Sequence, residues 1–217
     1  TIRPLICQYI GALPSAGKVV ASKREVKPVT GVVENIFKRK QETPKSTAYM
    51  MWHNTTMPYN TKNALCASIA GQILSMEYLD KIREKESAAY SVGANGGCSV
   101  GKDNYRMFQI FAYCPMKPEK KEVAMRIMND EVKNLANTCD PAKLDKCKEY
   151  MIKSYHDSQK SNSYWLSIIN QYNNLGIDQY TDYLKTLESL TPQDICNYMK
   201  EFNKSGNHIT VAMLPEE

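Results

Sequence analysis

The stretch TTMPYNTKNALCASIAGQILSMEYLDKIREKES, residues 55–87, decides the fold of the chain. Its apolar residues Leu65, Ile69, Ile73, Met76 and Leu79 follow one another at intervals of four, four, three and three. This spacing places them on one face of a helix, because an α-helix completes a turn in about 3.6 residues. The sequence therefore predicts a long amphipathic helix from residue 61 to residue 85, with its apolar face against a second layer.

Alternating apolar and polar residues on both sides of this helix predict strands. Before it lie GVVENIFKRK (31–40) and KSTAYMMWH (45–53), separated by the turn signal QETP. After it, AYSVGANGGCSVG (89–101) and YRMFQIFAYC (105–114) flank KDN, which predicts an antiparallel hairpin. The segment HITVAMLP (208–215) predicts a last strand.

Helical patterns fill most of the second half of the chain. They cover residues 118–137, 141–160, 163–174 and 191–203. Another pattern, over residues 2–13, ends at GALPS and is typical of the end of an element that began earlier. The order of strands, long helix, hairpin, helices and strand predicts an α+β fold in which one sheet is backed by helices.

Composition and charge exclude two classes of partner. The 217 residues carry a net charge of +5, and the densest basic points, FKRK (37–40) and KPEKK (117–121), are short. Because a phosphate-binding surface needs a sustained basic stripe, we expect no binding of nucleic acid. We also expect no membrane span, since no apolar run approaches the roughly 18 to 20 residues that a bilayer requires.

Common catalytic motifs are missing from the sequence. The histidines at positions 53, 156 and 208 are isolated and none begins an HxxEH or HExxH motif, so we expect no metal site and no cofactor in this chain. We interpret His53 as a structural histidine and Cys66, within the apolar helical stretch, as a small core residue. The glycines of GANGGCSVG (93–101) match no phosphate-binding loop and indicate a close backbone approach, a bulge or a twist.

Arg83 and Tyr90 remain as candidate functional residues. An arginine in the last turn of a helix interacts favourably with the helix dipole, and a tyrosine at the start of a strand has high β-propensity. These structural explanations account for both residues without any function.

Three segments resemble the pitrilysin, or insulinase, family of inverted zinc metallopeptidases. YLDKIREKESAAYSVGA (78–94) is similar to the sequence after the long helix in the C-terminal half of that family. QYIGALPS (8–15) resembles the end of its preceding domain, and VAMLP (211–215) resembles its terminal strand. The resemblance implies a mixed, largely antiparallel sheet backed by helices on one side, as in one domain of a clamshell that closes over a peptide.

The resemblance also implies roles for the two candidates. In the family, an HxxEH zinc site lies in the N-terminal half, and an arginine and a tyrosine from the C-terminal half reach the substrate backbone at the scissile bond. Arg83 and Tyr90 match that pair in sequence and spacing. Tyr90 would then donate to the substrate carbonyl as a catalytic residue, and both would bind substrate. Exposed strand edges could also pair with an extended peptide.

Because HxxEH is missing, the chain is expected to be one part of such an enzyme. We assign residues 1–18 to the end of a preceding domain, 19–43 to a linker and 44–217 to a C-terminal non-catalytic domain. The expected partners are a peptide substrate and an upstream catalytic half of the same polypeptide, with zinc in the full-length enzyme. The alternative is an inactive family member that serves as a structural or interaction scaffold. The sequence leaves the location of the protein open. Bacterial members of the family are often periplasmic or exported, which favours such a location here.

Overall fold

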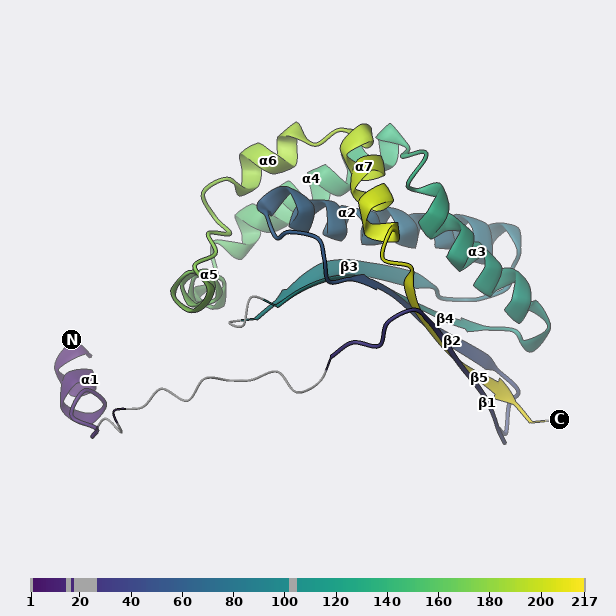
Figure 1. The fold of residues 1–217 in the computed structure, drawn as a ribbon, viewed down its shortest axis with the longest axis horizontal. Coiled ribbons are helices and arrows are strands. Elements are labelled where there is room, and N and C mark those ends of the chain that lie inside the picture. Colours follow the sequence, from purple (N-terminus) through teal and green to yellow (C-terminus); the bar gives the residue numbers. More distant parts are fainter. Residues whose placement is uncertain (1, 15–16, 18–26, 102–104, 217) are drawn as a thin grey trace.

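The computed structural model describes residues 2–14, 17, 27–101 and 105–216 (Figure 1). Its helices and strands are α1 (Arg3–Tyr9), β1 (Val32–Arg39), β2 (Ser46–Asn54), α2 (Thr61–Tyr78), the π-helix η1 (Leu79–Lys85), β3 (Gly93–Val100), β4 (Arg106–Met116), the 3₁₀-helix η2 (Pro118–Lys120), α3 (Lys121–Asn134), α4 (Pro141–Ser158), α5 (Asn162–Leu175), α6 (Tyr183–Ser189), α7 (Pro192–Asn203) and β5 (Asn207–Pro215). Of these, α6 is short and was not predicted.

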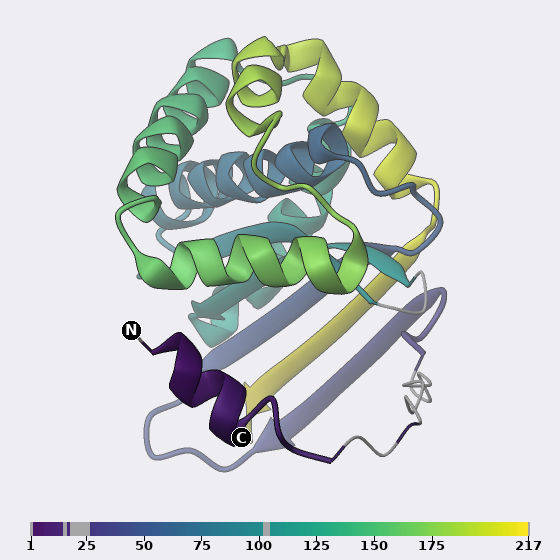
Figure 2. The ribbon, with the colours of Figure 1, turned by 90° about the vertical axis from the view of Figure 1, so that its left-hand side faces the viewer.

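One five-stranded sheet, in the order β1-β5-β2-β4-β3, forms the first layer. The pairs β5–β2, β2–β4 and β4–β3 are antiparallel, and β1 pairs in parallel with β5. Helices α2, α3, α4, α6 and α7 gather over one face of this sheet (Figures 1 and 2). The predicted fold, a mixed and largely antiparallel sheet backed by helices on one side, is confirmed.

The two faces of the sheet differ in burial. In β2, Ala48, Met50 and Trp52 point towards the helices and are buried, whereas Tyr49, on the alternate face, is 43% exposed. On that open face the Tyr49 ring lies 5.7 Å from the ring of Phe111, which is also exposed. The face of the sheet opposite these helices therefore presents aromatic side chains to solvent.

Helix α2 lies at the centre of the helical layer, where it contacts β3, α3, α4, α6 and α7. It begins where the Asn60 side chain accepts a hydrogen bond of 2.7 Å from the Asn63 amide. Leu65, Ile69 and Ile73 are buried as predicted. The helix predicted over 61–85 is confirmed in its extent, since η1 follows α2 directly and ends at Lys85. Its last seven residues have the wider turns of a π-helix, which the sequence pattern did not predict.

The backbones of α2 and β3 touch through glycine. A Cβ at Gly96 would lie 1.9 Å from the Ala67 carbonyl oxygen, and a Cβ at Gly71 would lie 2.1 Å from the Gly96 nitrogen. Neither position has room for a side chain. Of the three roles that the glycine-rich stretch suggested, close backbone approach is the one observed at Gly96.

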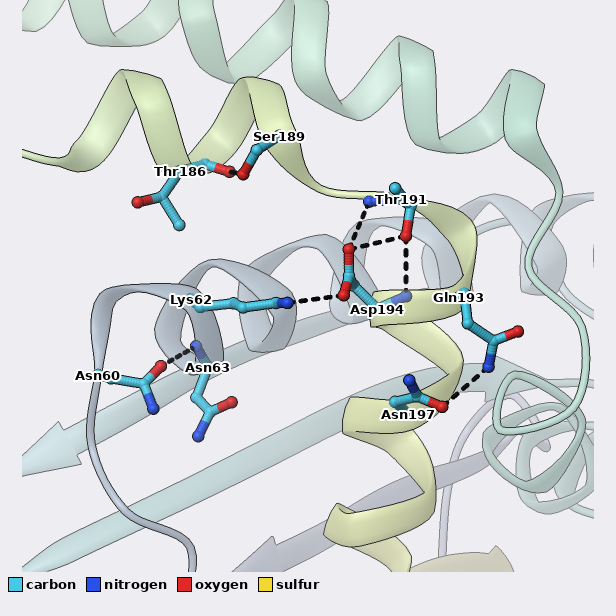
Figure 3. Close-up of polar contacts among 9 residues, drawn as sticks. All are labelled: Asn60, Lys62, Asn63, Thr186, Ser189, Thr191, Gln193, Asp194 and Asn197. Carbon is cyan, nitrogen blue, oxygen red and sulfur yellow. Dashed lines mark hydrogen bonds and ion pairs between the residues drawn. The ribbon is translucent and has the colours of Figure 1, made fainter.

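A polar network fastens the start of α2 to the start of α7 (Figure 3). Lys62 Nζ donates to Asp194 Oδ1 at 2.6 Å. The Thr191 amide donates to Asp194 Oδ2 at 2.9 Å and the Asp194 amide donates to Thr191 Oγ1 at 3.3 Å, which together form a capping box; the Thr191 hydroxyl also donates to Asp194 Oδ2 at 2.7 Å. The hydrogen bond from Lys62 lowers the pKa of the Asp194 carboxyl, with further contributions from Thr191.

The sheet begins inside the stretch that we assigned to the linker. β1 spans Val32–Arg39 and pairs with β5 along its whole length, so this part of residues 19–43 belongs to the sheet. Residues 19–26 of that stretch lie outside the described residues. Helix α1, in the segment expected to close a preceding domain, has no buried residue. The division of the chain into domains otherwise stays a prediction.

Candidate functional site

The segment between η1 and β3 is held in place by backbone hydrogen bonds on both sides. The Ala88 amide donates to the Ile82 carbonyl at 2.9 Å, and the Lys117 amide donates to the Ala88 carbonyl at 2.9 Å. Ala89 forms an isolated antiparallel bridge with Met116, the last residue of β4. The backbone just before Tyr90 is thus tied both to the end of η1 and to the end of β4.

The bend itself contains one residue with unusual backbone geometry. Ser87 has φ of +49°, in the left-handed region that residues other than glycine seldom adopt. Ala88 and Ala89 beyond it are buried, whereas Tyr90 is 86% exposed. The chain turns sharply after η1, buries two small residues and presents the tyrosine to solvent.

Arg83 and Tyr90 lie side by side. The guanidinium carbon of Arg83 is 5.3 Å from the centre of the Tyr90 ring, within the range of a cation–π contact. Arg83 Nε also lies 3.3 Å from a carboxylate oxygen of its neighbour Glu84. Within the described part of the chain, the Tyr90 hydroxyl has no hydrogen-bond partner. The structure therefore brings the two predicted residues together with the phenol free to donate.

Two details differ from the sequence-based picture. Tyr90 was expected at the start of a strand, but β3 begins at Gly93 and Tyr90 lies in the bend before it. Arg83 lies in the last turn of a helix as expected, but that helix is the π-helix η1. The wider π turn changes the direction of each later side chain, and π turns are frequent at functional sites.

A pocket of about 530 Å³ surrounds this pair. Its lining comes from the segment before β2, from residues 83 and 87–91, and from the end of β4; the charged members are Lys45, Arg83 and Lys117. The sequence analysis noted Lys117 only as part of the short basic stretch 117–121, and it gave neither Lys45 nor Lys117 a role in a site. Lys45 begins the strand predicted over 45–53 and Lys117 lies shortly after the strand predicted over 105–114, and this is the signal that could have placed them at one edge of the sheet.

The described residues do not fit a zinc site. No group of three histidine, cysteine or carboxylate side chains within residues 2–14, 17, 27–101 and 105–216 converges on one point. His53 is buried with Nε2 2.9 Å from the Val29 carbonyl oxygen, in agreement with a structural histidine. His208 stacks on Trp52 at 4.9 Å, and burial lowers the pKa of its imidazole.

The cysteines form no disulfide bridge, and those buried in the core are poor nucleophiles. All seven are free thiols, and Cys66 is buried in the core as predicted. Burial raises the pKa of Cys66 and of Cys114 to about 12, so neither forms a thiolate near neutral pH. None of the described helices is both long and apolar enough to cross a bilayer.

Comparison with known proteins gives a family match and several similar folds. A family model described as "Peptidase M16 inactive domain" matches residues 1–151. No curated protein matches the chain. The periplasmic protease PqqL from Escherichia coli is similar with a TM-score of 0.78 and 20% identity, over 99% of this chain and 24% of PqqL.

Two further solved structures have the same fold. The ferredoxin protease FusC, in complex with Arabidopsis ferredoxin, has a TM-score of 0.77 and 16% identity, over 99% of this chain and 23% of FusC. A peptidase M16 inactive domain from Pseudomonas fluorescens has a TM-score of 0.71 and 17% identity, over 99% of this chain and 50% of that one. The chain thus spans about a quarter of the length of PqqL and FusC.

Proposed function

The chain belongs to the M16 peptidase family, and we propose that it is the substrate-binding C-terminal domain of a zinc metallopeptidase, in which Arg83 and Tyr90 contact the peptide at the scissile bond. The observation that carries this proposal is the pairing of the two side chains at a pocket of about 530 Å³, where the guanidinium carbon of Arg83 lies 5.3 Å from the centre of the Tyr90 ring. The match to the inactive-domain model supports a non-catalytic part of a peptidase.

The chemistry of peptide hydrolysis explains why this pair would be useful. Attack on a peptide bond develops negative charge on the former carbonyl oxygen, and a hydrogen-bond donor aimed at that oxygen stabilises the transition state. The free and exposed hydroxyl of Tyr90 is such a donor. Arg83, next to the Tyr90 ring, presents a fork of donors that suits neighbouring peptide carbonyls.

The metal and the rest of the catalytic centre would come from an upstream half of the same polypeptide. The described residues of this chain do not fit a zinc site, and the chain matches only about a quarter of each of PqqL and FusC. The role of this domain is then to bind and orient the peptide. The periplasmic location of PqqL supports a periplasmic or exported location for this protein, and the ferredoxin complex of FusC supports a polypeptide substrate.

Hydrolysis of a quenched-fluorescence peptide library by the full-length protein tests this function. Tyr90→Phe removes the proposed donor and should lower kcat by roughly a hundredfold to a thousandfold, the scale for one oxyanion donor. Arg83→Ala should lower kcat/KM through weaker substrate binding. Tyr172→Phe, on an exposed tyrosine of α5, is the matched control and should leave turnover unchanged. Unchanged turnover in a folded Tyr90→Phe variant would show that the proposed role is wrong.

The second candidate is a catalytically inactive scaffold. Two features favour it: the inactive-domain description of the matching family model and the open sheet face around Tyr49 and Phe111, which could contact another protein. A full-length protein that cleaves no member of the library with zinc present would support the scaffold.

A further inference from the structure

The pocket of Arg83 and Tyr90 has a strongly one-sided charge. Its lining includes Lys45, Arg83 and Lys117, and it includes no aspartate or glutamate. The remaining lining residues are neutral. A pocket with three cations and no anion attracts negatively charged groups, and its concave shape strengthens that attraction.

The register of the sheet explains why the two lysines meet. The ladder between β2 and β4 ends with Ser46 opposite Met116. Lys45 directly precedes Ser46 and Lys117 directly follows Met116, so both lie at this end of the ladder, where they line the same pocket and are exposed. Like charges that share a pocket repel each other. An anion between the two ammonium groups would relieve this repulsion.

The nearby carboxylates do not neutralise these lysines. Glu84 lies against Arg83 at 3.3 Å, and Glu86 pairs with Lys120 at 3.0 Å. Neither lysine of the pocket forms an ion pair with any residue in the described part of the chain. Both ammonium groups are therefore available to a ligand.

We propose that Lys45 and Lys117 bind a carboxylate of the peptide close to the bond that is cleaved, from either an acidic side chain or the C-terminus of the peptide. This inference rests on the proposed function of Arg83 and Tyr90, since a peptide substrate makes a carboxylate the expected anion. The two lysines then determine specificity, while Arg83 and Tyr90 contact the backbone.

Matched peptides distinguish the two sources of the carboxylate. One pair differs by Glu against Gln at positions flanking the cleaved bond, and a second pair differs by a free against an amidated C-terminus. The full-length protein is assayed with each pair as wild type, as Lys45→Gln, as Lys117→Gln and as the double variant. Lys185→Gln, an exposed lysine of α6 outside the pocket, is the control.

The expected result is a preference for the anionic member of one pair. Each Lys→Gln change should reduce that preference in kcat/KM by about two- to fivefold, the scale of an exposed ion pair. The preference should also shrink as salt is added, because exposed charges are screened. Lys→Arg variants keep the positive charge and should therefore retain the preference for the anionic peptide. The Lys185→Gln control should behave as the wild type.

The outcomes separate this inference from the proposed function. If cleavage depends on Tyr90 but the double variant keeps the full preference for the anionic peptide, the inference is wrong and the proposed function stands. If the protein cleaves nothing, the proposed function fails. Fluorescence anisotropy with labelled versions of the same peptides then tests whether Lys45 and Lys117 bind the carboxylate. Weaker binding of the anionic peptide by the double variant would then support the inference, and equal binding would overturn it.

Discussion

Replacing Gly96 by alanine should force α2 and β3 apart. The new Cβ would lie 1.9 Å from the Ala67 carbonyl oxygen, whereas carbon and oxygen atoms in contact are separated by about 3.3 Å. The two atoms must therefore move apart by about 1.4 Å. The oxygen belongs to the backbone of α2 and the Cβ is fixed to the backbone of β3, so no side-chain rotation can provide the space.

The expected loss of stability is large for one methyl group. Overpacking costs about 1–3 kcal/mol where neighbouring side chains can shift. Here a helix backbone must move, so we expect the contact to lower the free energy of unfolding by about 3 kcal/mol. The lower entropy of the unfolded chain with alanine offsets about 0.4–1 kcal/mol of this loss, which leaves about 2–2.6 kcal/mol. For a chain of this size, that net loss corresponds to a Tm lower by about 4–10 °C.

The matched control is the adjacent glycine of the same strand. A Cβ at Gly97 meets nothing within 4 Å, so Gly97→Ala should not lower the Tm. Urea and thermal unfolding of the 217-residue chain, followed by circular dichroism, compare the two variants with the wild type. Equal midpoints for Gly96→Ala and Gly97→Ala would refute the backbone contact between α2 and β3.

Two further changes test other contacts. Asp194→Asn removes the ion pair with Lys62 and should cost about 1 kcal/mol in the free energy of unfolding at pH 7. Because the pKa of Asp194 is lowered by folding, this stabilisation is complete above the unfolded value of about 3.9 and is lost as the pH falls through the folded pKa. In urea unfolding of both proteins from pH 7 to pH 3, the difference between them should begin to shrink below about pH 3.9, and a constant difference would contradict the ion pair. Tyr78→Phe removes the buried hydroxyl that donates to the Met128 carbonyl at 2.9 Å, and it should cost about 1 kcal/mol in the free energy of unfolding measured in urea. Tyr150→Phe, at an exposed position of α4, should cost nothing, and similar losses in both variants would show that the buried hydrogen bond contributes no stability.

Apolar spacing predicted most of the elements, and its errors have a physical cause. Leu65 and Ile73 are buried on α2 as expected, but Met76 and Leu79 are only partly buried while Tyr78 is fully buried. The central position of α2 in its layer gives it neighbours on several sides, so its buried surface is wider than one stripe. The change to π turns after Tyr78 also breaks the 3.6-residue repeat that the pattern analysis assumes.

The candidate site was predictable in identity but not in geometry. The segment similar to the peptidase family identified Arg83 and Tyr90 as a pair, whereas their contact depends on the bend at Ser87 and on the bridge of Ala89 to β4. These are long-range features that local propensity does not contain. The same holds for Lys45 and Lys117, whose proximity follows only from the register of β2 against β4.

The position of β5 has a consequence for how the chain reaches its fold. This strand is the last of the described elements in sequence, yet it lies between β1 and β2 and pairs with both. The contact between Gly31 and Asn207 at its start joins residues 176 positions apart. During synthesis, β1 and the adjoining edge of β2 have no partner until β5 leaves the ribosome, so two strand edges stay open to other chains while the residues between β2 and β5 are translated. Completion of the sheet is a late event that closes a very long loop, and such contacts form slowly.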